Sequence, residues 1–87
     1  MKKSLVICGS MDRAREYFSI VASMTNVTKA SGSNLKVWME DMEYHFISTG
    51  KSESIRGQTY SQILIDRSAS LTEEEEAFYW SRLQVMQ

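Results

Sequence analysis

The sequence predicts a small α/β protein, a single domain over residues 1–87 that packs a mixed β-sheet against two helices in the order β-α-β-β-β-β-α. Short apolar runs at residues 5–8 and 63–65 are typical of strands buried on both faces of a sheet. Residues 35–48 instead alternate apolar and polar side chains, as strands with one exposed face do. Because parallel sheets need strands of the buried kind, we expect the first and last strands to be parallel neighbours.

The first apolar run leads into a turn and a helix. Gly9 and Ser10 end the run, and Ser10 or Asp12 can cap the helix that follows. Apolar side chains then recur at three- and four-residue spacing, which predicts a helix with one buried face: Ala14, Tyr17, Phe18 and Val21. Residues 26–30 predict a short second strand, and residues 31–34 have the composition of a turn.

The second half of the chain predicts a hairpin, a buried strand and a final helix. In residues 35–48 the period of two indicates two antiparallel strands, and Asp41 marks the turn between them. The run at 63–65 is the last strand. Thr72 opens the final helix, because Thr72 and Glu75 have the spacing of a capping box.

The composition is that of an ordinary folded domain, with 43% apolar and 24% charged residues. The net charge of −1 provides no general attraction to nucleic acid or to an anionic membrane, so we expect neither as a partner. Cys8 is the single cysteine, which excludes an intramolecular disulfide, and no run approaches the roughly 20 apolar residues that span a bilayer; both indicate a cytoplasmic location. Cys8 and the lone His45 are interpreted as structural, and no catalytic residue, metal or cofactor is predicted.

Residues 54–69 have the most distinctive pattern in the chain. A polar turn, Arg56-Gly57, leads into three apolar residues that end on Asp66. With the hairpin before it, this segment resembles the middle of the ATPase domain of phage large terminases and related P-loop motors, in which such a strand delivers an aspartate to Mg²⁺. The resemblance implies an incomplete P-loop-like topology without catalysis, because the sequence has no G-x-x-x-x-G-K-[ST] phosphate loop and Arg67 stands where the catalytic acid would follow.

A second resemblance concerns residues 6–11. They are similar to the strand and turn that open nucleoside deoxyribosyltransferase-like proteins, in which the Gly-Ser turn helps to hold a nucleotide. Backbone N–H groups at the start of a helix can also bind a phosphate. This alternative describes a nucleotide-binding protein or a nucleotide-processing enzyme that uses Gly9, Ser10 and Asp66, and it requires Gly9 and Asp66 to lie at one edge of the sheet.

Each of these residues also has a simpler structural interpretation. Gly9 and Ser10 can form no more than a turn and a helix cap. Asp66 can pair with Arg67 or Arg56. One carboxylate without phosphates nearby would bind a metal ion weakly, so the structural interpretation of Asp66 is favoured.

The C-terminal segment, residues 78–83, has more aromatic side chains than one buried helix face needs. Trp and Arg dominate the energetics of many protein interfaces. Tyr79, Trp80 and Arg82 are therefore the predicted partner-binding residues, with Arg82 on the helix face of Phe78. The predicted contact surface is the final helix together with the hairpin. The equally open alternative is that the aromatic rings complete the small core.

The leading prediction is a small non-enzymatic adaptor or inhibitor domain that binds another protein, encoded by a phage and derived from a terminase-like ATPase core. Homodimerisation through an exposed strand edge stays open. A nucleic-acid binder is a third possibility and would need a local basic patch built from Lys2, Lys3, Arg13 and Arg15.

Overall fold

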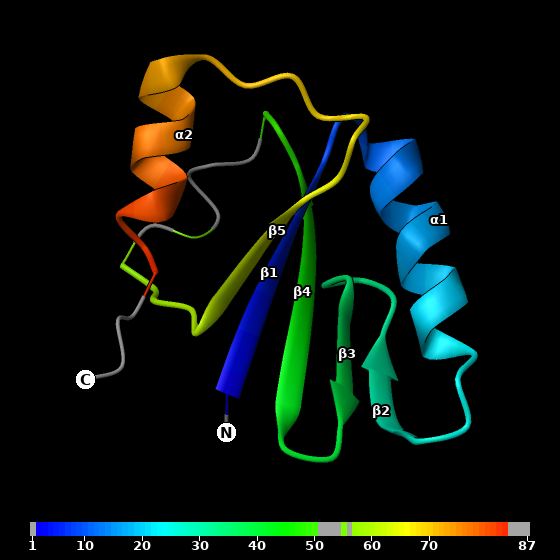
Figure 1. The fold of residues 1–87 in the computed structure, drawn as a ribbon. Coiled ribbons are helices and arrows are strands. Elements are labelled where there is room, and N and C mark those ends of the chain that lie inside the picture. Colours follow the sequence, from blue (N-terminus) through cyan, green and yellow to red (C-terminus); the bar gives the residue numbers. More distant parts are fainter. Residues whose placement is uncertain (1, 51–54, 56, 84–87) are drawn as a thin grey trace.

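The computed structural model describes residues 2–50, 55 and 57–83, and it has the predicted order of elements. A five-stranded mixed sheet carries one helix on each side (Figure 1). The elements are β1 (Lys2–Cys8), α1 (Met11–Ala22), β2 (Val27–Ser31), β3 (Lys36–Met39), β4 (Met42–Ser48), β5 (Gln62–Ile65) and α2 (Glu73–Trp80). The prediction of a small α/β fold is thus confirmed.

The strand order is β2-β3-β4-β1-β5, so β1 is flanked by two neighbours. It pairs in parallel with both β4 and β5, while β2, β3 and β4 form an antiparallel meander. The predicted parallel pairing of the first and last strands is confirmed, with Ser4 opposite Gln62 and Ile7 opposite Ile65. This pairing places the ends of β1 and β5 side by side.

One face of the sheet packs against α1. Alternate side chains of β1, Val6 and Cys8, point to this face and meet the buried Ala14 and Val21 of the helix. Phe46 of β4 adds aromatic contacts to two rings of α1, at centroid distances of 5.7 and 6.2 Å. The helix lies directly on the strands, because small and apolar side chains recur on its inner face.

The opposite face is closed differently. Leu5 and Ile7 of β1 pack with Ile55 and Tyr60 from the segment before β5 and with Tyr79 from α2. The helix α2 begins with the predicted capping box, which the reciprocal hydrogen bonds of its Thr and Glu side chains confirm. On this face, therefore, loop residues lie between much of the sheet and the helix.

Two turns differ in detail from the prediction. Leu35 is not a strand residue: its φ of 51° places it in the left-handed region at the end of the turn, and β3 begins at Lys36. Leu35 is nevertheless buried, because its side chain still reaches the core under α1. Glu40, also with a φ of 51°, shares the hairpin turn with Asp41. Arg56 of the predicted Arg-Gly turn lies outside the described residues.

Candidate functional site

The structure brings Gly9 and Asp66 to the same edge of the sheet. Each follows one of two parallel neighbours, β1 and β5, and the Asp66 N–H donates to the carbonyl of Ile7 at 2.8 Å. The chain leaves β1 towards α1 on one face and leaves β5 towards α2 on the other (Figure 1). In open α/β sheets, ligands bind where neighbouring connections part in this way. The nucleotide-binding alternative required this arrangement.

The polar groups at this edge are, however, engaged with one another. The Gly9 N–H donates to Ser68 Oγ at 2.9 Å, and the Ser10 hydroxyl accepts from the Arg13 N–H at 3.1 Å. The Asp66 carboxylate accepts from Arg13 Nε at 3.2 Å and Nη2 at 3.3 Å, and from the N–H of Ser68 at 3.1 Å. A Cβ on Gly9 would overlap the carbonyl of Ser68, so glycine is needed for this close approach. The edge is closed by the chain itself.

The electrostatics of Asp66 fit an internal ion pair. Hydrogen bonds from Arg13 and then Ser68 lower the pKa of the Asp66 carboxyl from 3.8 to about 2, although burial opposes them. The same pairing raises the pKa of Arg13, whose Nη1 also lies 2.5 Å from Glu16. Arg67, one of the two expected partners, is thus not the partner of Asp66, because its side chain points to solvent while α1 brings Arg13 within reach. The other expected partner, Arg56, lies outside the described residues.

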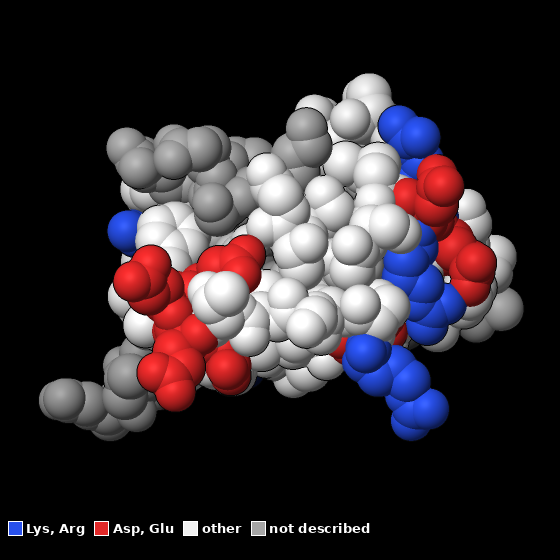
Figure 2. Space-filling view, turned by 90° about the horizontal axis from the view of Figure 1, so that it is seen from above, with Lys and Arg blue, Asp and Glu red and all other residues white. Residues whose placement is uncertain are grey.

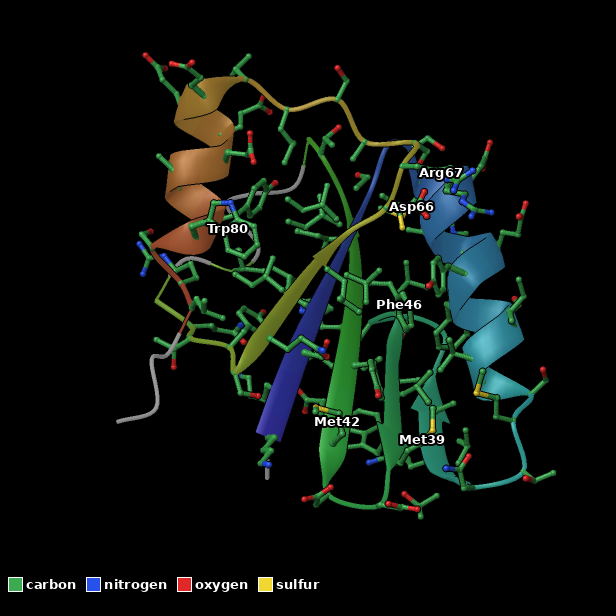
Figure 3. All side chains as sticks on the ribbon, in the orientation of Figure 1. Met39, Met42, Phe46, Asp66, Arg67 and Trp80 are labelled. Atoms are coloured by element: carbon green, nitrogen blue, oxygen red, sulfur yellow. The ribbon has the colours of Figure 1, made fainter. Side chains whose placement is uncertain are left out.

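A hollow of about 540 Å³ lies beside this edge, between α1 and the end of β5. Its charged lining residues are Arg13, Asp66 and Arg67, and Figure 3 shows the last two where β5 ends next to α1. Within the described part of the chain, no three His, Cys, Asp or Glu side chains gather to hold a metal ion. What the hollow offers a ligand is therefore mainly the exposed guanidinium of Arg67.

A buried pair that the sequence did not reveal lies on the α2 side of the sheet. Nδ1 of His45 lies 3.2 Å from the hydroxyl of Tyr60. Burial, together with the charge of Lys36, lowers the pKa of His45 to about 4, and burial raises the pKa of Tyr60 to about 12. Both groups are thus neutral near pH 7. His45 and Tyr60 are 15 residues apart in the sequence and meet only because the segment before β5 folds over the sheet. No local sequence pattern predicts this contact.

Cys8 is fully buried, as predicted for a core residue. Burial and the charge of Asp66 raise the pKa of its thiol to about 11, which leaves the reactive thiolate unpopulated near neutral pH. Cys8 and His45 are therefore poor candidates for nucleophile and base.

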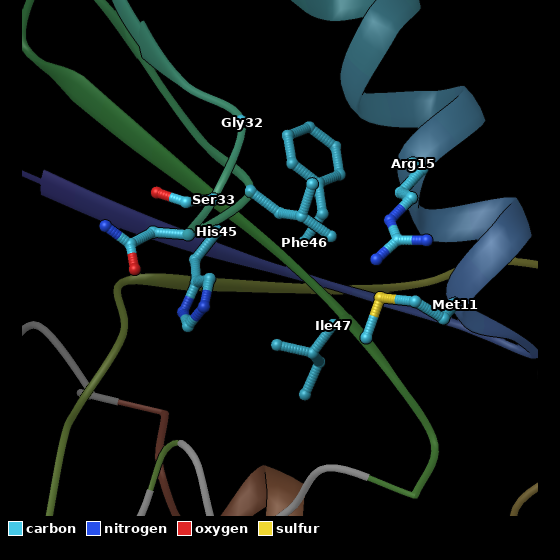
Figure 4. A pocket seen from close by; sticks show the side chains of 9 residues that line it. Met11, Arg15, Gly32, Ser33, His45, Phe46 and Ile47 are labelled. Carbon is cyan, nitrogen blue, oxygen red and sulfur yellow. The ribbon is translucent and has the colours of Figure 1, made fainter.

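A smaller pocket of about 180 Å³ opens between the first turns of α1, residues 32–35 and β4 (Figure 4). Met11 and Arg15 extend into it from α1, and His45 and Phe46 belong to its strand side. Because His45 is neutral, Arg15 provides the positive charge of this pocket. Its size suits a side chain better than a nucleotide.

The three predicted partner-binding residues differ in how deeply they are buried. Tyr79 is fully buried, and its hydroxyl donates to the Thr49 carbonyl at 3.3 Å, so its assignment to a partner surface is corrected: it is a core residue. Trp80 is 44% exposed. Arg82 lies beyond α2, stacks over the Phe78 ring at 5.1 Å as its predicted spacing requires, and has a buried Nε without an acceptor among the described residues.

Charge is spread over the surface. Figure 2 shows acidic side chains gathered at α2, where the first turn contains Glu73, Glu74, Glu75 and Glu76, and mixed basic and acidic side chains near α1. The four residues considered for nucleic-acid binding are divided, since Lys2 and Lys3 begin β1 whereas Arg13 and Arg15 lie beyond its other end. They do not form one basic patch.

Comparison of the chain with protein-family models, curated proteins and solved structures found no match. The terminase-like resemblance therefore stays a prediction. Across the described ranges, no helix has the length and apolar character needed to cross a membrane.

Proposed function

We propose that this chain is a small, non-enzymatic domain that binds another protein. One contrast carries the proposal. The polar groups at the ends of β1 and β5 are used by the chain itself. In the described part of the chain, by contrast, four large apolar residues keep 40% or more of their surface exposed: Ile20, Met24, Leu64 and Trp80. Exposed apolar groups that cluster on a small protein mark interaction surfaces.

The first contact surface that we propose is the end of α2, where Trp80 and Arg82 are the anchors. Trp80 is 44% exposed, so part of this residue is available to a partner. The guanidinium of Arg82 is held over Phe78, so little conformational entropy is lost when it binds a carboxylate or carbonyl oxygen.

The proposal is tested by quantitative capture of proteins from the native cells with tagged wild-type chain, Trp80→Ala, Arg82→Ala and the control Glu74→Gln. We expect the wild type and the control to capture the same specific protein. The captured amount should fall at least about tenfold with either anchor variant, which corresponds to a loss of about 1.4 kcal/mol of binding free energy. Equal capture by all four chains would remove the α2 surface.

The alternative is nucleotide binding at Gly9, Ser10 and Asp66. Their placement at one edge favours it, but the hydrogen bonds of Ser68 and Arg13 must break before a phosphate can enter. Amide spectra of the labelled chain, titrated with Mg²⁺-ATP and then with a nucleoside monophosphate, distinguish the two functions. Saturable shifts at Gly9 and Asp66 would support the nucleotide site, and unchanged spectra would support protein binding.

Two further elements belong to the proposal. A cytoplasmic location suits a chain whose one cysteine is a buried thiol. Descent from a phage terminase-like ATPase core would account for an apolar strand that leads into Asp66 where no phosphate loop exists.

A further inference from the structure

The face of the sheet that α1 covers is only partly occupied. The helix packs chiefly on β4, also touches β1, β3 and β2, and hardly reaches β5. Strands lie about 4.8 Å apart, so five of them span about 19 Å, whereas a packed helix occupies about 10 Å. α1 lies over the middle strand, β4, so this face has room for a second helix on its β5 side, where Leu64 is exposed.

The free part of this face is an apolar groove of about 230 Å³. One wall is formed by Tyr17 and Val21 of α1 and by Met24, two residues after the helix. Side chains of β1, β3, β4 and β5 form the floor: Val6, Met39, Tyr44, Phe46 and Leu64. Leu64 is 40% exposed and Met24 is 48% exposed. Two of the large apolar side chains that are exposed in the described part of the chain, Leu64 and Met24, therefore line this groove.

The groove has a charged end. Past Val6 and Leu64 it continues into the hollow that contains Arg13, Asp66 and Arg67. Arg13 pairs with Asp66, so these two charges largely cancel in the hollow, and Glu16, the second partner of Arg13, does not line it. Arg67 is exposed and leaves this end of the groove positive, which favours an occupant with a carboxylate at the matching position.

The shape of the free face favours a helix over a strand as its occupant. A strand that pairs with the edge of β5 would extend the sheet and leave the groove beside α1 open. A helix beside α1 would cover Leu64 and Met24 and complete the layer, as helices do in α/β sheets. Its inward side chains would recur at i, i+3, i+4 and i+7.

We propose that the groove between α1 and β5 binds one amphipathic helix of a partner protein, with its apolar stripe on Leu64 and Met24 and a carboxylate near Arg67. This inference rests on the proposed protein-binding function but uses a different surface from Trp80 and Arg82. It names the secondary structure and the charge of the partner segment.

The test is an amide NMR titration of the labelled chain with synthetic peptides of about 18 residues, which as helices are about 27 Å long. One peptide has Leu at i, i+3, i+4 and i+7 spacing and Glu at one end, the second has Lys in place of Glu, and the third is a scrambled sequence. We expect saturable shifts at Val6, Met24 and Leu64 with the first peptide. The second should bind about threefold more weakly, and the third should not bind.

Variants make the test specific. Leu64→Asp should lower the affinity for the peptide with Glu at least about tenfold. Arg67→Glu should reverse the preference, so that the peptide with Lys binds more tightly than the peptide with Glu. Trp80→Ala is the matched control, an exposed aromatic residue away from the groove, and should leave both affinities unchanged. If Leu64→Asp lowers the folded fraction, Met24→Asp, outside α1, replaces it.

The inference is wrong if neither ordered helix binds saturably, if the shifts lie at Trp80, or if both groove variants leave the affinity unchanged. It is also wrong if sedimentation shows a dimer that Leu64→Asp dissociates, because a second copy would then fill the groove. Failure here while Trp80→Ala still abolishes protein capture would leave the proposed function in place. A helix that binds the groove while Trp80→Ala and Arg82→Ala change nothing would remove the α2 surface alone.

Discussion

The two faces of the sheet are closed in different ways. On one face, α1 lies directly on the strands, with Ala14 and Val21 buried against Val6 and Phe46. On the other, Tyr79 of α2 reaches the core together with residues of the segment before β5. The first face is built by direct helix-on-sheet packing, and the second by an irregular segment with a short helix behind it.

This difference determines what each face exposes. Direct packing leaves a groove where the helix is too narrow for the sheet, and Leu64 and Met24 are exposed there. The irregular segment follows the surface of the sheet and buries a polar pair, His45 and Tyr60, instead. A helix thus covers a defined width of a sheet, whereas a loop can adapt to the rest, at the cost of burying polar groups that then need partners.

The largest expected effect concerns the loop-closed face. Tyr79→Ala should lower the free energy of unfolding by about 3–4 kcal/mol, because a fully buried aromatic ring and its hydrogen bond to the Thr49 carbonyl are lost. Urea unfolding measures this value. The control is Glu74→Gln, at an exposed position of α2, expected to change stability by less than about 0.5 kcal/mol. A loss below about 1 kcal/mol for Tyr79→Ala would mean that α2 contributes little to this face.

The buried pair on the same face gives the next effect, as pH changes. The pKa of His45 is lowered from 6.5 to about 4, so the unfolded chain takes up a proton first as the pH falls. Stability is therefore complete above about pH 6.5 and should decline by about 2 kcal/mol by about pH 4.5. Urea midpoints across this window check the decline, which His45→Gln should remove. A His45 ring signal that titrates near 6.5 would contradict it.

Where the two faces meet at the strand ends, Gly9→Ala should cost about 1.5 kcal/mol. The new methyl group would overlap the Ser68 backbone and force the loop after β5 to move. Gly32→Ala is the control, since a Cβ there meets nothing within 4 Å. Thermal unfolding of both variants compares them, and equal midpoints would show that the Gly9 contact is not tight.

The smallest effect concerns the ion pair at the same edge. Asp66→Asn should lower stability by about 1 kcal/mol near pH 7, because its hydrogen bonds with Arg13 and Ser68 become weaker. The pKa of Asp66 is lowered, so the wild-type advantage is present above about pH 4 and is lost as the pH falls towards 2. Denaturation of both chains at pH 7, 4 and 2.5 measures the difference. An advantage that persists at pH 2.5 would exclude this origin.

Local patterns predicted the elements because each has a local cause. The run at 63–65 is a strand of apolar, partly β-branched residues, and Thr72 with Glu75 forms a capping box whose partners are three residues apart. Boundaries were less accurate. Leu35 follows the alternating pattern yet takes a left-handed turn conformation, since a buried side chain is compatible with either backbone.

The candidate site was predicted only in part. Gly9 and Asp66 do share an edge, as parallel strands require. The hydrogen bonds of Gly9 with Ser68 and of Asp66 with Arg13, however, join residues more than 50 positions apart, and no local sequence pattern predicts them. Tyr79 and Trp80 are neighbours of similar apolar character, and only packing separates the buried ring from the exposed one.

By itself, the sequence determined the number, type and order of the elements and the parallel pairing of β1 with β5, because periodicity, apolar runs and caps depend on neighbouring residues. Tertiary structure alone decided which groups remain available. Whether Leu64 is covered depends on the width of α1 against five strands, and whether Asp66 is free depends on where α1 places Arg13. Both outcomes depend on contacts between segments that are far apart in the sequence. Local sequence patterns do not specify such contacts, which form only when the helices pack on the sheet.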